Sequence, residues 1–78
     1  MEMECHATIE RVNEENAWVR WSLAPAGGAP IAQGLARYDL ETVQFRWEEG
    51  RPPAEQMFLV RTTIDRVVRG RSRSTGNS

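Results

Sequence analysis

The chain contains no lysine, and it has one cysteine and one histidine among its 78 residues. A single cysteine cannot form an internal disulfide, and one Cys with one His leaves a zinc site short of ligands. Cys5 and His6 are adjacent on a predicted strand, so their side chains point to opposite faces and cannot share one metal ion. We therefore expect no metal, no cofactor and a reducing, cytoplasmic environment.

The sequence also lacks a long apolar run. No stretch approaches the roughly 18 apolar residues that a spanning helix requires, so we expect no membrane segment. The acidic start, Met1 to Glu4, lacks the positive charge and the apolar core of a signal peptide. All ten basic residues are arginine, a bias typical of GC-rich coding, which favours a bacterial or phage origin.

Positive charge is scarce outside the last ten residues. Residues 1–68 carry seven arginines against eleven acidic side chains. A dedicated duplex-DNA binder needs a broad positive face, so this balance argues against that class.

Alternation of apolar and polar residues predicts four strands. They cover residues 5–12, 17–23, 31–38 and 43–47, and short polar or Gly/Pro-rich turns separate them. Ile9, Val19, Trp21, Phe45 and Trp47 are expected on the inner face. For residues 31–38 the sequence does not decide which alternate side chains face the core, because Gly34 suggests a bulge or a close backbone approach.

The spacing of apolar residues changes after Pro52-Pro53. From Ala54 the apolar residues recur at helical spacing, and they form one stripe. This stripe contains Met57, Val60, Ile64 and Val68, with Phe58 on its flank. Leu59 points away from the stripe and, with Phe58, is a candidate dimer contact. Gly70 is expected to end the helix as its C′ residue.

One apolar sheet face and one apolar helix stripe can bury each other. The sequence therefore predicts a two-layer α+β fold, a four-stranded antiparallel meander followed by one C-terminal helix (ββββα). Residues 1–70 form the single domain, and residues 71–78 form a flexible, disordered basic tail.

The other face of this sheet has nothing in the sequence to cover it, and its side chains are the candidate binding site. An exposed indole beside guanidinium groups can grip a protein surface or a base. The predicted patch consists of Trp18, Arg20, Gln44 and Arg46. The arginines at the chain end, Arg69, Arg71 and Arg73, form a second candidate contact.

No catalytic constellation is visible. His6 has no evident nucleophile beside it, and the acidic pairs fall in turns that offer no rigid cleft. The prediction is therefore a non-catalytic module that binds another macromolecule, most simply a protein (itself or another), through the open sheet face. The alternative is a nucleic-acid-binding module that uses the strand-face Trp and Arg residues and the Arg-rich tail.

Overall fold

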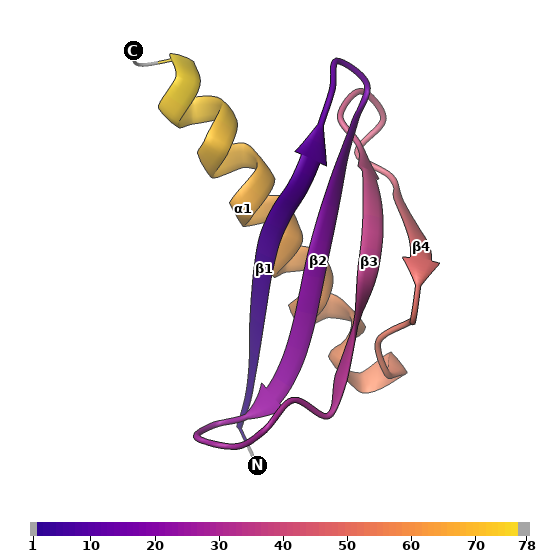
Figure 1. Ribbon diagram of the computed structural model, residues 1–78, viewed down its shortest axis with the longest axis vertical. Coiled ribbons are helices and arrows are strands. Elements are labelled where there is room, and N and C mark those ends of the chain that lie inside the picture. The colour runs from indigo at the N-terminus through magenta and orange to yellow at the C-terminus, as the bar shows by residue number, and fades with distance from the viewer. Residues whose placement is uncertain (1, 77–78) are drawn as a thin grey trace.

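Four antiparallel strands form one sheet, and a C-terminal helix crosses one of its faces (Figure 1). The computed structural model describes the backbone of residues 2–76 and the side chains of residues 2–70. The elements in chain order are β1 (Met3–Val12), β2 (Asn16–Pro25), β3 (Ala32–Asp39), β4 (Phe45–Glu49), the short 3₁₀ turn η1 (Ala54–Gln56) and α1 (Met57–Gly76). The strands lie in the order β1-β2-β3-β4, which confirms the predicted ββββα meander.

The helix begins where the sequence predicts and ends later. Pro53 has φ −57° and leads directly into η1, because a proline suits the start of a helix. At the other end α1 continues to Gly76, so the prediction that Gly70 ends the helix is wrong. Gly70 does not have the positive φ that a left-handed C′ residue adopts. The expected flexible tail, residues 71–78, lies outside the residues whose side chains the structure describes.

The core is built where α1 covers β2 and its neighbours. Of the expected core residues, Val19, Trp21, Val60, Ile64 and Val68 are buried. The structure adds Ala17, Leu23, Ala36 and Tyr38 to the buried hydrophobic core. The remaining expected core residues, Ile9, Phe45, Trp47 and Met57, are half-buried.

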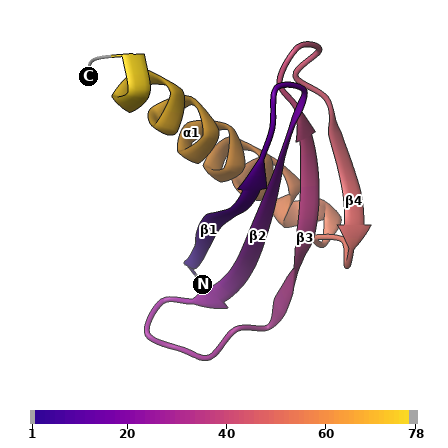
Figure 2. The same ribbon diagram turned by 45° about the horizontal axis from the view of Figure 1, so that its top comes forward.

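The partial exposure near β4 follows from the path of the helix. α1 runs diagonally behind the sheet from the lower end of β4 toward β1 (Figures 1 and 2), and it packs chiefly against β1 and β2. The inner face of β4 is therefore only partly covered. Leu59 was expected to point away from the core, but it is half-buried and packs against it, whereas Phe58 is 81% exposed.

A β-bulge in β1 reverses the expected alternation. Ile9 pairs with Val19 and Arg11 with Trp18, so Glu10 is the additional residue. An additional residue shifts every later side chain to the opposite face. Val12 consequently packs against the core, and Arg11 joins the face that α1 leaves open.

The pairing of β3 with β2 resolves the parity that Gly34 left open. Gly34 lies opposite Trp21, and Arg37 lies opposite Trp18. Ala36 and Tyr38 therefore face the helix, while Leu35 and Arg37 face the open side. A Cβ on Gly34 would lie 2.0 Å from the carbonyl oxygen of Glu49, so the residue must be glycine for the two backbones to approach this closely.

The fourth strand was expected to begin at Val43, but β4 begins only at Phe45. Val43 closes the β3–β4 turn with φ +59°, and its N–H donates to the carbonyl of Asp39 at 2.9 Å. A left-handed conformation is strained for a β-branched residue.

No helix among the described residues is long and apolar enough to cross a membrane.

Candidate functional site: the open face of the sheet

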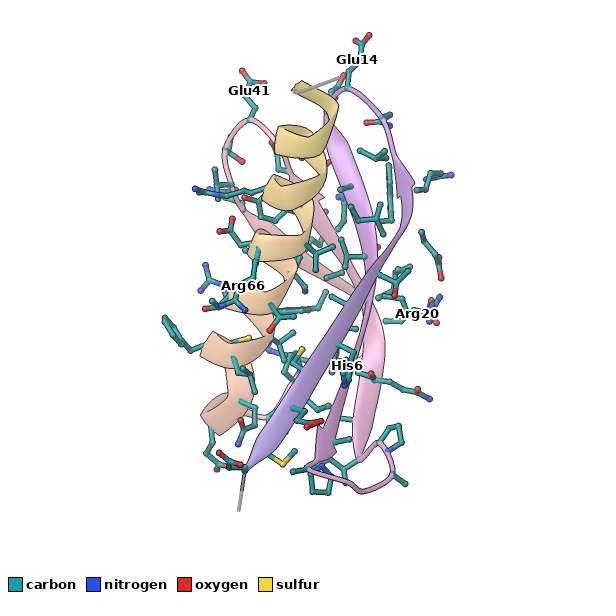
Figure 3. The ribbon with its side chains drawn as sticks, turned by 90° about the vertical axis from the view of Figure 1, so that its left-hand side faces the viewer. His6, Glu14, Arg20, Glu41 and Arg66 are labelled. Carbon is teal, nitrogen blue, oxygen red and sulfur yellow. The ribbon has the colours of Figure 1, made fainter. Side chains whose placement is uncertain are left out.

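The face of the sheet opposite α1 has no second layer over it in residues 2–76. Figure 3 shows Arg20 on this open face, on the opposite side of the sheet from Arg66 of α1. Side chains alternate along each strand, so every second residue projects here, except at the register shifts in β1 and β4, where Glu10 and Glu48 are additional residues. We use "open face" for this surface below.

A row of arginines and one tryptophan crosses the open face. Arg11 of β1 pairs with Trp18 of β2, Trp18 pairs with Arg37 of β3, and Arg37 pairs with Arg46 of β4. Adjacent strands are about 4.8 Å apart, so the row is about 14 Å wide and spans the whole sheet. We call these four residues the Arg/Trp row. It contains two of the predicted patch residues, Trp18 and Arg46.

The indole of Trp18 is half-buried and already has a cationic neighbour. The guanidinium carbon of Arg11 lies 4.0 Å from the ring centroid, within the range of a cation–π contact. The β1 bulge makes this contact possible, because it turns Arg11 onto the open face. Trp18 is therefore less exposed than the sequence predicted, with Arg11 against its ring and Arg37 opposite it on β3.

Arg20, a third predicted patch residue, lies beside the row and is held by carboxylates. Its Nε donates to Glu10, and its Nη2 is 3.7 Å from Glu49. These contacts raise the pKa of Arg20, chiefly through its hydrogen bond to Glu10. Arg20 lies opposite Leu35, so it does not join Arg46 as directly as the sequence suggested.

Gln44, the fourth predicted residue, precedes β4 and is close to one end of the row. It lines a small hollow of about 110 Å³ together with Arg37, Asp39 and Arg46. The backbone N–H groups of Thr42 and Glu41 donate to Asp39 and lower its carboxyl pKa. Gln44, Arg46 and Arg37 therefore form the more polar end of the open face.

Sequence reasoning missed Arg11 and Arg37. Arg37 forms an ion pair with Glu48, with 3.3 Å between Nε and Oε1, and it lies between Trp18 and Arg46 in the row. A signal for Arg11 was present, because the apolar pair Ile9 and Val12 is spaced by three residues, which breaks the period of two. For Arg37 the signal was weaker and consisted of the match between the bulky Trp21 and Gly34 on the facing strand.

The charges of the open face are mixed. The four arginines Arg11, Arg20, Arg37 and Arg46 share it with five carboxylates. These are Glu4, Glu10, Asp39, Glu48 and Glu49. Three of the arginines have a carboxylate or indole contact, whereas no described carboxylate lies within ion-pair distance of Arg46.

A shallow hollow of about 400 Å³ lies over the other half of the open face. His6, Thr8 and Ser22 line it, beside the Glu10–Arg20 pair. The nearest carboxylate to His6 is Glu4, at 3.9 Å on the same strand. Among the described residues, neither hydroxyl is hydrogen-bonded to the imidazole, which is the contact that activates a nucleophile.

No comparison with known protein families, curated proteins or solved structures finds a match for this chain.

The remaining predicted contact residues lie elsewhere. Arg69 is on α1, across the sheet from Trp18, and its Nε donates to Asp65 at 3.0 Å. Asp65 also accepts a hydrogen bond of 2.6 Å from the Tyr38 hydroxyl. Burial, followed by this hydrogen bond, raises the pKa of Tyr38. Arg71 and Arg73 lie outside the residues whose side chains the structure describes.

The thiol of Cys5 is half-buried on the helix side, where burial raises its pKa and a hydrogen bond with Thr63 partly opposes the shift. Residues 2–70 contain no group of three His, Cys, Asp or Glu side chains that could hold a metal ion.

A second unusual surface lies between β4 and α1. Two adjoining hollows of about 360 and 340 Å³ share Val43, Phe45 and Arg61 in their linings. Phe58 borders one of them, and Arg61 lies 5.1 Å from the centroid of Phe45. We call this surface the β4 groove.

Proposed function

We propose that this protein is a non-catalytic protein-binding module, and that the open face of its sheet is the contact surface. The observation that carries the proposal is the Arg/Trp row, which spans the full width of a face that no described element covers. Trp and Arg are the residues that most often dominate binding energy at protein interfaces. A reducing cytoplasm as the place of action, and a bacterial or phage source, belong to the same proposal.

The charge pattern favours a protein partner over a polyanion. The open face carries four arginines and five carboxylates, so it has no excess of positive charge that would attract a phosphate backbone. A mixture of positive and negative side chains instead favours a protein with the complementary charge pattern. A protein with a different pattern would place like charges opposite each other and bind less tightly. The expected partner presents carboxylates to Arg46 and Arg37 and a cation or apolar group to Trp18.

The absence of a catalytic role in this proposal rests on contacts at the open face. Glu10 and Arg20 bind each other, and His6 has no hydrogen-bonded hydroxyl among the described residues. The hollow beside them is wide and open to solvent, whereas most small-molecule sites are concave and bury most of their ligand.

The test is affinity purification from the source organism, followed by direct titration of the purified partner. Trp18→Ala and Arg11→Ala are the test variants, and Arg66→Ala on the opposite side of the molecule is the matched control. We expect each test variant to weaken binding at least about tenfold, which is the threshold of a moderate hot spot. Equal affinities for the wild type, Trp18→Ala and Arg66→Ala would rule out the open face.

A second candidate function is nucleic-acid binding, which the Arg/Trp row also favours. A tryptophan between two arginines resembles the aromatic and cationic platforms on which single-stranded bases stack. Fluorescence anisotropy with labelled single- and double-stranded oligonucleotides separates the two candidates. A nucleic-acid complex must weaken steeply as salt rises from about 50 to 200 mM, and no binding at low salt removes this candidate.

A further inference from the structure

β4 is an edge strand with an unoccupied side. It is last in the order β1-β2-β3-β4, so among the described residues only β3 pairs with it. The N–H of Asp39 donates to the carbonyl of Gln44 at 2.8 Å. Backbone groups alternate in an antiparallel ladder, so Arg46 also turns toward β3, whereas Phe45 and Trp47 direct theirs outward. The register shifts after Trp47, where Glu48 is an additional residue, so the regular template that this edge offers another strand is residues 45–47.

The sequence of β4 is complementary to itself. In an antiparallel pairing of two copies about Trp47, the outward backbone groups of Trp47 bond to those of the same residue in the second copy. Arg46 of each copy then lies opposite Glu48 of the other. These two side chains project on the open face, and opposite charges in facing positions stabilise a strand pair.

Apolar side chains next to this edge are exposed in the single chain. Phe58 is 81% exposed and Val43 is 42% exposed, and both border the β4 groove. Phe45 and Trp47 form the sheet side of the groove and are only half-buried. A two-fold axis through Trp47 keeps both helices on the same face of the sheet. The grooves of the two copies then adjoin, and each Phe58 is available to fill the shared space.

We propose that β4 is a self-association edge, at which two copies pair antiparallel about Trp47 into one eight-stranded sheet. Arg46 belongs to both this edge and the Arg/Trp row, but the open-face function is tested at Trp18 and Arg11, which lie away from β4, so the two proposals can fail separately. A two-fold contact is isologous and closes after two copies.

The opposite edge does not offer the same complementarity. β1 carries Glu4 and Glu10 on its open face, and Glu2 precedes it, against Arg11 at the far end. Pairing β1 with itself about Ala7 would place Glu4 opposite Glu10, and facing like charges are destabilising. Pairing β1 of one copy with β4 of the next does not close and would form chains.

Charge exchange at β4 tests the proposal. Arg46→Glu and Glu48→Arg each place like charges at both facing positions of the homodimer, and we expect each to weaken self-association at least about tenfold. When the two variants are mixed in equal amounts, every facing pair is again opposite in charge. A heterodimer should then form, with an affinity near that of the wild type. Sedimentation velocity measures the affinities, and native mass spectrometry identifies the heterodimer.

The folding of each variant is controlled separately. In the single chain Arg46 faces Arg37, so Arg46→Glu replaces a like-charge pair with an opposite one and should not lower the melting temperature. Glu48→Arg removes the contact with Arg37, so Phe58→Asp provides an independent disruption at a residue whose side chain is already exposed. Arg66→Glu carries the same charge change as Arg46→Glu, away from β4, and should leave the dimer intact.

The outcomes divide cleanly. Loss of the dimer in Arg46→Glu and Phe58→Asp, with recovery in the mixture of charge variants, supports the two-fold edge. A wild type that is monomeric at about 100 μM, in the micromolar-to-millimolar range of weak complexes, overturns it. So does a dimer that survives Arg46→Glu and Phe58→Asp, or a concentration-dependent polymer, which would indicate the β1–β4 contact.

Discussion

Replacing Gly34 with alanine should destabilise the protein far more than its size suggests. A Cβ at this position would lie 2.0 Å from the Glu49 carbonyl oxygen and 2.9 Å from a ring carbon of Trp21. Neither neighbour can move easily, because one is backbone in β4 and the other is a fully buried core ring. Real Cβ atoms require more than 3 Å, so β4 must move away from β3.

The magnitude follows from the cost of an overpacked core. Such changes cost about 1–3 kcal/mol and occasionally more, and here the clash also breaks the pairing of Leu35 with Glu49. We expect a loss of about 3 kcal/mol, which for a domain of this size lowers the melting temperature by about 15 °C.

Gly70→Ala is the matched control. This glycine lies within α1, and a Cβ there would meet nothing within 4 Å. Alanine in a helix is favoured over glycine by about 0.5–1 kcal/mol, so Gly70→Ala should raise the melting temperature by a few degrees. Thermal unfolding followed by far-UV circular dichroism measures both variants. If the melting temperature of Gly34→Ala equals that of the wild type, β3 and β4 do not approach this closely, and the register at β4 is wrong.

Three further predictions concern single side chains. Trp21→Ala should lower the free energy of unfolding by about 3–5 kcal/mol, because it leaves a cavity in the core. Trp18→Ala should lower it by less than about 1 kcal/mol. Similar midpoints of urea unfolding for the two variants would refute the assigned strand faces. Val43→Asn should stabilise the protein by about 1 kcal/mol, since asparagine tolerates positive φ better than valine, and a destabilised variant would contradict the strain. The lowered pKa of Asp39 stabilises the folded state above the ordinary value of 3.8, and this contribution disappears as the pH falls below it. In Asp39→Asn the free energy of unfolding should therefore fall less at acid pH than it does in the wild type. The same dependence on pH in both proteins would argue against a stabilising role of the Asp39 carboxylate.

The element order was predictable because the apolar period changes clearly along the chain. Alternation by two holds in β2, where Ala17, Val19, Trp21 and Leu23 are all buried. A period of 3.6 replaces it after Pro53, and the stripe residues Val60, Ile64 and Val68 are indeed buried. These patterns are visible within short segments of the sequence, and each apolar face requires only one other apolar face to cover it.

What the sequence could not provide were the features that depend on contacts between strands. The bulge at Glu10 exists because β1 must stay in register with β2 on both sides of it, and it alone brings Arg11 onto Trp18. The face of Arg37 depends on the fit of Gly34 under Trp21. The half-exposure of Trp47 depends on the diagonal path of α1, which no local pattern encodes.

Three unfavourable features of the described residues gather around β4. Val43 combines a strained φ of +59° with an exposed apolar side chain, Arg37 faces Arg46 across a strand pair, and Phe58 places its ring in water beside the groove. Each lowers the stability of a single chain, and a neighbour would relieve the like-charge pair and cover the two apolar side chains, although it would not change the φ of Val43. In the proposed pairing, a second copy at β4 would cover Val43 and Phe58 and would give Arg46 the carboxylate of Glu48. An exposed apolar pair and a like-charge pair that one contact would relieve together are features that the proposed β4 pairing explains and that the folding of a single chain does not.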